Sequence, residues 1–238
     1  MDFLVFDLKG KFAHFRKFYT NSSSLSYSVP PRTTIEGLIA AILGYERDSY
    51  YEILDSQKLN IGLKKLTPTR KIVQSLNYIK ATSISHVIKP KEHTQVPFEI
   101  VTSEGNLGYR VYVNHIDERI MEDLEDRLKN NRFYYVPYLG VASFNLSLEF
   151  KGRFQGKLKF DEDFVEISSI IRKSLIKEGG LDVNIEGIIV KEKMPRDFLK
   201  DRIIKEIEDY IFEENGGPLR VKLNSYYYEI NDEKIVLM

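Results

Sequence analysis

The sequence predicts an α+β protein whose N-terminal part follows the ferredoxin-like order strand, helix, strand, strand, helix, strand. Three observations carry this prediction. Short β-prone apolar segments alternate with two amphipathic segments, a Pro-Pro pair stands just before the first of these, and a long basic segment follows the second strand. We expect residues 1–150 to form this part and residues 151–238 to form a mainly β C-terminal part.

The first strand and the first helix have clear boundaries in the sequence. Phe3–Leu8 is short and apolar, and a Lys-Gly pair ends it. Pro30-Pro31 forces an extended approach to a helix that Thr33 or Thr34 caps, with Glu36 complementing the cap. Apolar residues spaced by three and four then continue to Gly44, where we expect the helix to end.

The later elements follow from the same signals. The expected elements are a helical continuation at Ser49–Leu54, a strand at Leu59–Leu66, a projecting basic hairpin or loop at Arg70–Glu99, strands at Phe98–Thr102 and Tyr109–Asn114 around a turn at Ser103–Gly108, a helix at Asp117–Asn131 and a strand at Phe144–Phe150. In the C-terminal part they are strands at Val165–Ile176 and Asn184–Val190, a helix or a strand at Lys200–Phe212, and a hairpin at Ser225–Leu237 turned at Asn231-Asp232.

Composition excludes several classes of protein. The 238 residues contain no cysteine, which excludes disulfides and thiolate metal sites, and four scattered histidines leave little for a metal centre. We therefore expect no cofactor and no metal. The N-terminus lacks the features of a signal peptide, and the longest apolar run, Gly37–Leu43, is too short to span a membrane. The sequence thus predicts a soluble, cytoplasmic protein.

The charges are balanced in number but unevenly placed. The net charge is +0, yet residues 8–35 contain no acid and combine basic with aromatic residues. A second acid-free window, residues 56–91, holds eight lysines and arginines. Such segregation is typical of a face that binds a polyanion, and the aromatic rings favour one that carries bases. The alternatives are a solvated lysine-rich surface and, for the phenylalanines, a place in the core.

Two smaller signals leave alternatives open. The first helix has its N-terminus beside Arg32, which suits a phosphate but also suits an ordinary helix. Metal-free RNA cleavage needs a general acid, a general base and a cation. The residues that could supply these groups are Tyr78, Lys80, His86, Lys91 and His93. No fixed spacing joins them, and no phosphate-cradling or nucleophile motif is present in the sequence.

The segments GKFAHFRKFYT and SYSVPPRTTIEGLIAAILG resemble the N-terminal signature of the CRISPR-associated Cas-five proteins of the RAMP superfamily, and most closely those of type I-B. YVPYLGVASF, Glu192–Pro195 and YYYEINDEKIVLM resemble later parts of the same family. The resemblance implies a ferredoxin-like (RRM-like) palm, an inserted β-hairpin thumb at about 67–100 and a β-rich C-terminal part. It also implies a role in antiviral defence as a subunit of the Cascade interference complex. Such a subunit holds the 5′ handle of crRNA and contacts the backbone and large subunits. It meets target DNA through the assembled complex.

Carried onto this chain, the resemblance predicts a noncatalytic RNA-binding surface. The expected RNA-binding residues are Lys9, Lys11, His14, Arg16, Lys17, Tyr19, Tyr27, Arg32, Thr33, Thr34, Arg70, Lys71, Tyr78 and Lys80. One branch of the family cleaves precursor crRNA without metal, and this remains the alternative function. A general RNA- or DNA-binding protein outside CRISPR is the third possibility. A preference for the repeat-derived 5′ end would distinguish a handle-binding subunit from such a protein.

Overall fold

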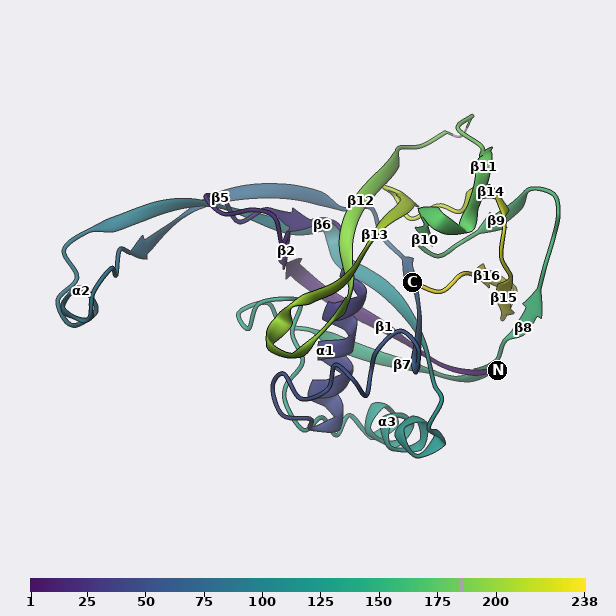
Figure 1. Cartoon of the computed structure of the whole chain (residues 1–238), viewed down its shortest axis with the longest axis horizontal. Helices are drawn as coiled ribbons and strands as arrows, with labels where there is room; N and C mark the ends of the chain where they lie inside the picture. The colour runs from purple at the N-terminus through teal and green to yellow at the C-terminus, as the bar shows by residue number, and fades with distance from the viewer. Residues whose placement is uncertain (185) are drawn as a thin grey trace.

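The fold is built on an antiparallel five-stranded sheet, in which four strands lie side by side and the fifth, β5 (Arg70–Ile79), pairs with the outer half of one of them. In a computed structural model describing residues 1–184 and 186–238, the strand order is β4 (Leu59–Lys65), β6 (His93–His115), β1 (Asp2–Ala13) and β7 (Ser147–Gln155). Helices α1 (Arg32–Leu43) and α3 (Glu118–Asn130) pack against each other and cover one face (Figure 1). Along the chain the order is β1, α1, β4, β6, α3, β7, which is the predicted order.

Strand β1 shows how the alternation of its side chains builds two cores. Leu4, Phe6 and Leu8 lie in the large core under the helices. Phe3 and Val5 point to the opposite face, where they pack against Ile230 and Ile235 of the C-terminal hairpin. Successive side chains of a strand alternate between the faces of its sheet, so β1 contributes to both layers.

The two helices begin and end for different reasons. Helix α1 starts at Arg32 after Pro31, and no side chain caps it. The predicted caps by Thr33 and Thr34 were therefore wrong, because both residues already lie in the first turn. Gly44 ends the helix in the left-handed conformation with a φ of 86°, as predicted. Helix α3 is capped by the Asp117 side chain, which accepts a bond from the Arg119 amide.

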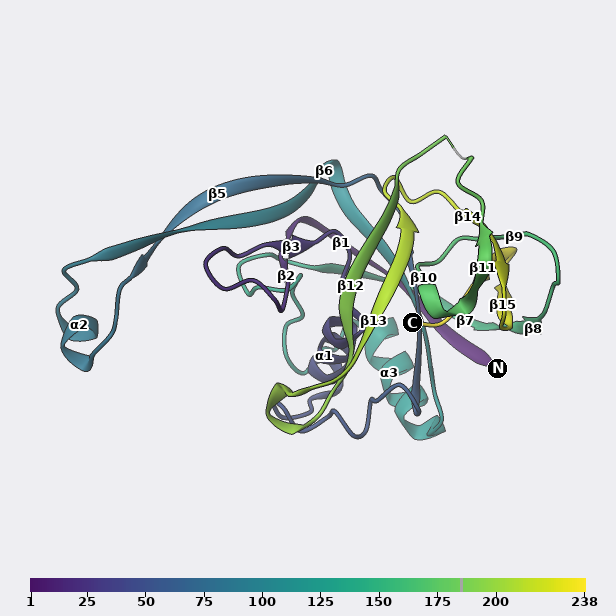
Figure 2. The same ribbon diagram turned by 45° about the horizontal axis from the view of Figure 1, so that its top comes forward.

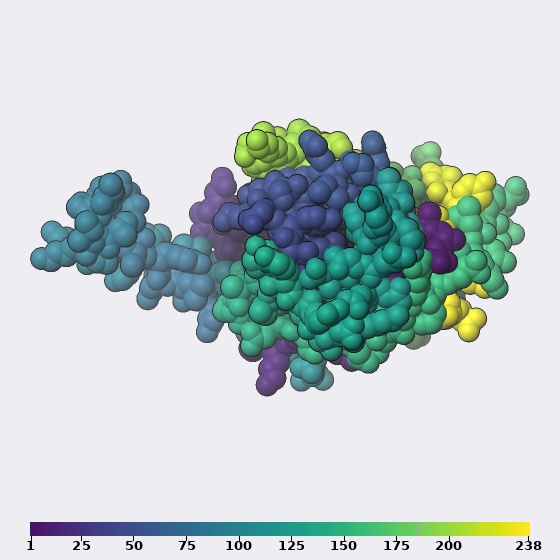
Figure 3. Space-filling view, turned by 90° about the horizontal axis from the view of Figure 1, so that it is seen from below, coloured from purple at the N-terminus to yellow at the C-terminus, as the bar shows by residue number. Residues whose placement is uncertain are grey.

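A long hairpin, the thumb, projects from the body (Figures 1 and 2). It consists of β5 (Arg70–Ile79), α2 (Ile84–Ile88) and the first half of β6, and β5 pairs with β6 from Arg70–Thr102 to Ile79–His93. The space-filling view shows this segment extending well beyond the rest of the surface (Figure 3). A projecting basic hairpin or loop was predicted here, and the segment is a hairpin.

The predicted turn at Ser103–Gly108 was wrong. Strand β6 runs without interruption through this segment and belongs to both the thumb and the sheet. Gly10 pairs with Leu107 and Phe12 pairs with Thr102, so residues 103–106 form a bulge opposite β1. The turn-like residues serve to bend the strand and do not reverse it. The predicted helical continuation at Ser49–Leu54 was also wrong, because that segment consists of turns.

The C-terminal part is mainly β, as predicted. Its elements are β8 (Lys157–Lys159), β9 (Val165–Ile167), β10 (Ile171–Arg172), η1 (Lys173–Leu175), β11 (Ile176–Leu181), β12 (Ile189–Phe198), η2 (Lys200–Arg202), β13 (Ile204–Glu213), β14 (Leu219–Leu223), β15 (Tyr227–Ile230) and β16 (Glu233–Ile235). They form three small sheets, ordered β10-β13-β12, β11-β14-β9 and β16-β15-β8.

Two C-terminal predictions were refined. The ambiguous segment Lys200–Phe212 is a short 3₁₀ turn followed by a strand. The terminal hairpin turns at Asn231 and Asp232, which have φ values of 46° and 64°, as predicted. The strand predicted at Val165–Ile176 is interrupted, and the one predicted at Asn184–Val190 begins only at Ile189. Within the latter, Ile185 lies outside the described residues.

The two parts of the chain share one core. Met194, Tyr210 and Phe212 from the C-terminal part belong to the same buried cluster as the residues of α1. The fully buried Arg32 joins the parts, because its guanidinium donates to Asp197 at 2.9 Å and to the Leu59 carbonyl at 2.6 Å. The expected boundary at residue 150 falls inside β7. None of the helices in the described residues is long and apolar enough to cross a membrane.

Candidate nucleic-acid interface

A groove lies at the edge of the sheet, where β1 reaches the base of the thumb. Its volume is about 470 Å³. It lies beside the bulge between β1 and β6, and the loop that precedes β7 forms another wall. The lining residues are Lys9, Gly10, Lys11, Phe12, Asn106, Ser143, Phe144, Asn145, Leu146 and Ser147.

The groove combines cations, rings and neutral hydrogen-bonding groups. Lys11 is exposed, and Lys9 is shared with Glu149 through an ion pair. Phe12 is 41% exposed and packs against Phe144 with 5.9 Å between the ring centroids. Ammonium groups suit phosphates, half-exposed rings suit stacked bases, and amides suit base edges, so this set matches single-stranded RNA better than a small apolar ligand.

Glycine is required where the loop before β7 crosses β1. Gly140 has a φ of 86°, and a Cβ atom there would lie 1.9 Å from the carbonyl oxygen of His14. The backbone bond from the His14 amide to the Leu139 carbonyl, 3.1 Å long, holds this crossing. The YVPYLGVASF stretch thus brings Ser143–Ser147 against Lys9 and Lys11 by a close backbone approach.

The base of the thumb is organised by Glu99, which the sequence analysis did not single out. Its carboxylate accepts a bond from the Ser26 amide at 2.7 Å and pairs with Lys71 at 3.2 Å. Its carbonyl oxygen lies 2.7 Å from His14 Nδ1. These bonds fasten β3 (Ser26–Tyr27) and His14, which precedes β2 (Phe15–Arg16), to the base of the thumb.

His14 is therefore an internal residue, and its expected direct contact with RNA is corrected. The ring is 3% exposed and stacks on Phe98 at 4.0 Å. Because Nδ1 faces a carbonyl, it carries the proton, and Nε2 accepts from the Ser24 hydroxyl at 3.0 Å. Burial lowers the pKa of His14, and Arg16 lowers it further, while the Glu99 carbonyl opposes them.

Tyr27, Arg32 and Thr33 are also buried. The Tyr27 hydroxyl donates to the Lys193 carbonyl at 2.7 Å, and burial raises its pKa. Arg32 is bound to Asp197 and to carbonyl oxygens, and it also pairs with Glu36. The expectation that these three side chains contact RNA is corrected, because they face the interior. Arginine is rarely buried without partners, and Glu36 and Asp197 supply them for Arg32.

The other ten expected residues all reach the surface. Tyr19 is 51% exposed and forms an edge-to-face pair with Phe18. Lys17 pairs with Glu192 at 2.8 Å, and although burial alone would lower the pKa of its ammonium, this bond raises it. The surface-accessible members of the expected set are Lys9, Lys11, Arg16, Lys17, Tyr19, Thr34, Arg70, Lys71, Tyr78 and Lys80.

Six of these residues lie in three places. Lys9 and Lys11 lie in the groove, while Arg70 and Lys71 lie at the base of the thumb, where Lys71 also donates to the Ser26 carbonyl at 2.6 Å. Tyr78 and Lys80 lie farther out on the thumb, and Lys80 pairs with Glu92 at 2.9 Å. The sequence analysis did not identify Asn106, Ser143, Asn145 or Ser147 as groove residues; only the YVPYLGVASF similarity pointed to this region.

Comparison with known proteins gives one family and several similar folds. The profile of a family described as "CRISPR-associated protein (Cas_Cas5)" matches residues 3–153. No curated protein sequence gives a significant match. The crystal structure of a CRISPR protein from Archaeoglobus fulgidus is similar over 99% of this chain and 98% of that chain, with a TM-score of 0.57 and 14% identity.

Two chains from larger assemblies have the same kind of fold. One belongs to a CRISPR RNA-guided surveillance complex, with a TM-score of 0.51, 14% identity, and coverage of 92% of this chain and 90% of that chain. The other belongs to the Type III-B Cmr-beta complex bound to cognate target RNA and AMPPnP, with a TM-score of 0.56, 12% identity, and coverage of 91% and 86%. At such identities the similarity establishes the fold alone.

Proposed function

The chain belongs to the Cas5 family of CRISPR-associated proteins, and from this premise we propose that it is a noncatalytic subunit of a type I Cascade complex. In this role it binds the 5′ handle of crRNA and contacts the backbone and large subunits, and it meets target DNA through the assembled complex. The fold supports this proposal. The strand order β4-β6-β1-β7 and the two helices on one face suit a ferredoxin-like palm, and the hairpin between β4 and the palm half of β6 suits its thumb.

The groove beside the thumb is the observation that carries the proposal. It brings Lys9 and Lys11 together with the half-exposed Phe12 and with the amides of Asn106 and Asn145. Arg70 and Lys71 continue the basic surface to the thumb. A single strand lying along this line would have phosphates near ammonium and guanidinium groups and a base near an aromatic ring.

The alternative is metal-independent cleavage of precursor crRNA. The residues considered for it lie on the thumb, where Tyr78 is 48% exposed and His86 Nδ1 lies 3.0 Å from the Thr82 hydroxyl. Lys80 pairs with Glu92. This arrangement favours a role in contact over a role in catalysis, because the Lys80 ammonium is already paired with Glu92 and would have to leave that carboxylate to stabilise a developing charge.

Binding and cleavage are tested with the purified protein and RNA of the repeat that accompanies its gene. We expect affinity for the repeat-derived 5′ end to exceed that for a scrambled strand of equal length at matched salt, measured by fluorescence anisotropy. We also expect the RNA to remain intact without divalent metal. Equal affinity for the scrambled strand would refute handle binding, and specific cleavage at the handle boundary would establish the nuclease alternative.

The groove itself is tested by a double variant, Lys9→Ala with Lys11→Ala. Each phosphate contact to a single strand contributes about 0.7 to the slope of log K against log salt. We therefore expect weaker binding and a slope smaller by about 1.4. Lys205→Ala, which removes an exposed lysine of β13, is the matched control and should leave both quantities unchanged. An unchanged slope in the double variant would exclude the groove as the binding site.

A further inference from the structure

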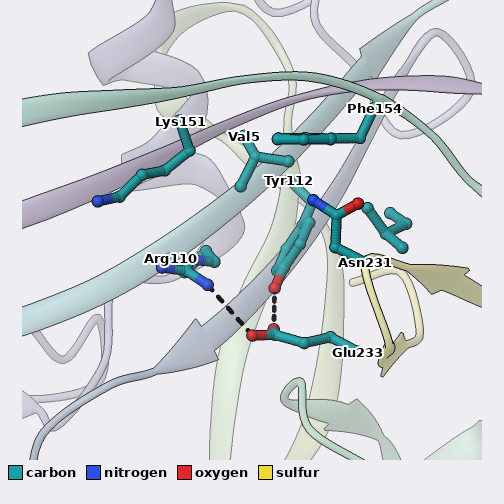
Figure 4. A pocket seen from close by; sticks show the side chains of 8 residues that line it. Val5, Arg110, Tyr112, Lys151, Phe154, Asn231 and Glu233 are labelled. Carbon is teal, nitrogen blue, oxygen red and sulfur yellow. Dashed lines mark hydrogen bonds and ion pairs between the residues drawn. The ribbon is translucent and has the colours of Figure 1, made fainter.

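A second cavity lies on the sheet face opposite the helices. The C-terminal hairpin β15–β16 covers part of that face, and a pocket of about 260 Å³ remains between hairpin and sheet. Figure 4 shows Val5 and Tyr112 from the sheet, Phe154 from β7 and Asn231 from the hairpin turn around this space. The pocket is thus walled by an aromatic ring and aliphatic groups, with polar groups at its rim.

The charges beside the pocket already satisfy one another. Glu233 accepts from Arg110 at 3.1 Å and from the Tyr112 hydroxyl (Figure 4). It also pairs with Lys64 at 3.1 Å. Arg110 also holds the buried Asp7 with two bonds of 2.8 and 3.2 Å. Glu233, Arg110 and Asp7 therefore need no charged partner from a ligand. They form a polar wall whose side chains are already held in place by their own hydrogen bonds.

Two pocket groups are uncommitted. The Phe154 ring is half-buried and lines the space. The Asn231 amide makes no hydrogen bond within residues 1–184 and 186–238, and its backbone, with a φ of 46°, holds it at the tip of the turn. A flat ring with hydrogen-bonding groups on its edge complements Phe154 and Asn231. Its face could stack on the phenyl ring, and its edge could bond to the side-chain amide oxygen and nitrogen of Asn231.

The pocket is connected to the groove through side chains of β1 and β7. Glu149 pairs with both Lys9, which lines the groove, and Lys151, which lines the pocket. Lys151 also pairs with Asp7 at 3.4 Å. In this linked set of ion pairs, three carboxylates are shared by four cations, which leaves one excess positive charge; the carboxylates are those of Asp7, Glu149 and Glu233, and the cations are Lys9, Lys64, Arg110 and Lys151. From Gly10 to Val5 along β1 the separation is roughly 17 Å, at about 3.4 Å per residue. A short length of extended single-stranded RNA spans that distance.

We propose that this pocket receives one base of the bound single-stranded RNA, stacked on Phe154 and hydrogen-bonded to Asn231, with the adjoining phosphate at Lys151. The proposal rests on the proposed function, because the groove must carry the strand that delivers this base. Single-stranded RNA is recognised by bases that leave the stack and rest on aromatic side chains. The pocket supplies one such position and would select the nucleotide that occupies it.

An abasic scan combined with Phe154→Ala tests the proposal in the full-length protein. Each nucleotide of the repeat RNA is replaced in turn by an abasic residue, and affinities are measured by anisotropy at low salt. In the wild type we expect one position to weaken binding at least about 5-fold, which is the loss of one stacked base. In Phe154→Ala that position should have no further effect, because a double-mutant cycle reports the shared contact.

Two further variants keep the test decisive. Asn231→Gly removes the amide while favouring the left-handed turn, and it should reduce the effect of the same abasic position. Phe160→Ala removes a ring that is 46% exposed on the C-terminal part and should preserve the wild-type scan. A free mononucleotide competing as strongly as the strand would show a pocket for nucleotides alone and would overturn delivery by the strand.

The outcomes separate this proposal from the proposed function. If the wild type binds repeat RNA but no abasic position loses its effect in Phe154→Ala or Asn231→Gly, the base pocket is refuted and handle binding stands. If Phe160→Ala abolishes the effect equally, the pocket is likewise refuted. If the wild type does not bind repeat RNA, both ideas fall together.

Discussion

His14 shows how a single residue of the basic aromatic segment serves the fold. Its imidazole receives a hydroxyl bond from Ser24, donates to the Glu99 carbonyl and rests on the Phe98 ring. This neutral ring therefore connects β1, the loop that follows it and the base of the thumb. Protonation would place a donor on Nε2 and a charge in a buried site, and both changes weaken the arrangement.

The pH dependence of stability should report this burial. Because burial lowers the pKa of His14 in the folded state, the unfolded chain binds the proton more readily. The contribution of the neutral ring is thus present above about pH 6.5 and is lost as the pH falls below that ordinary value. We expect urea denaturation to show a smaller loss of stability between pH 7.5 and pH 5 for His14→Gln than for the wild type.

The control for this prediction is His86→Gln, because His86 belongs to the thumb helix, where no side chain is buried. It should retain the full pH dependence of the wild type. Identical pH profiles for the wild type and His14→Gln would contradict the assignment of the effect to His14.

At the residue scale, sequence patterns identified the chemical character of the side chains better than they predicted which side chains are exposed. Lys11 and Tyr19 are exposed as expected, whereas Tyr27 and Arg32, of similar type, are fully buried. The difference depends on partners such as Lys193 and Asp197, more than 160 residues away along the chain. The local pattern of residues 14–32 gives no sign of those distant partners. Composition alone could therefore not separate side chains on the surface from side chains that pack inside the fold.

The thumb is an element whose outer end contributes little to the stability of the body. All five residues of α2 are unburied, and Ile84 and Ile88 are each 79% exposed. Ile79 of β5 pairs with His93 of β6, so a two-residue turn can close the hairpin at this point. Replacing residues 80–92 by Asn-Gly removes the tip and supplies a turn that favours a hairpin.

We expect this shortened thumb to change the free energy of unfolding by no more than about 0.5 kcal/mol, because it removes no buried side chain. Chemical denaturation followed by circular dichroism measures the change. Val101→Ala, in the fully buried part of the same strand, is the comparison and should cost about 1–3 kcal/mol. A loss of stability in the shortened thumb equal to that of Val101→Ala would show that the tip is part of the folded core.

Elements were predictable where their signal is local. The amphipathic spacing of residues 117–131 predicted α3 within one residue at each end. The bulge at 103–106 was not predictable, because glycine and asparagine mark a bulge and a reverse turn alike, and the choice depends on how β1 aligns with β6. For residues 200–212 both periods fit, and pairing with β12 decides in favour of the strand.

At the scale of the whole molecule, the buried Arg32 fastens the palm to the C-terminal part. Asp197 accepts from this guanidinium and from the Ser56 amide at 3.0 Å. Asp197→Ala would leave the Arg32 charge buried with only part of the ion pairing that compensates for its burial. We expect a loss of about 3–5 kcal/mol in the free energy of unfolding, measured by urea denaturation, because breaking a buried pair exposes the cost of burying the remaining charge.

Lys191→Ala is the matched control on the same strand, since Lys191 pairs with Asp209 at 3.4 Å and is 56% exposed. Loss of a surface pair of this kind should cost less than about 1 kcal/mol. If Asp197→Ala costs no more than Lys191→Ala, the two parts are held together by their apolar contacts alone. The sequence could not predict this connection, because Arg32 and Asp197 lie in segments with no common pattern.

The continuity of β6 has a mechanical consequence. The strand has hydrogen-bonded partners in the thumb through β5 and in the sheet through β1 and β4, with no connecting loop between the two regions. A force applied at the thumb tip is therefore carried as torque along one covalent strand into the centre of the molecule. A displacement of the thumb tip would thus be passed through the bulge at 103–106 to the segment of β6 that carries Arg110 and Tyr112.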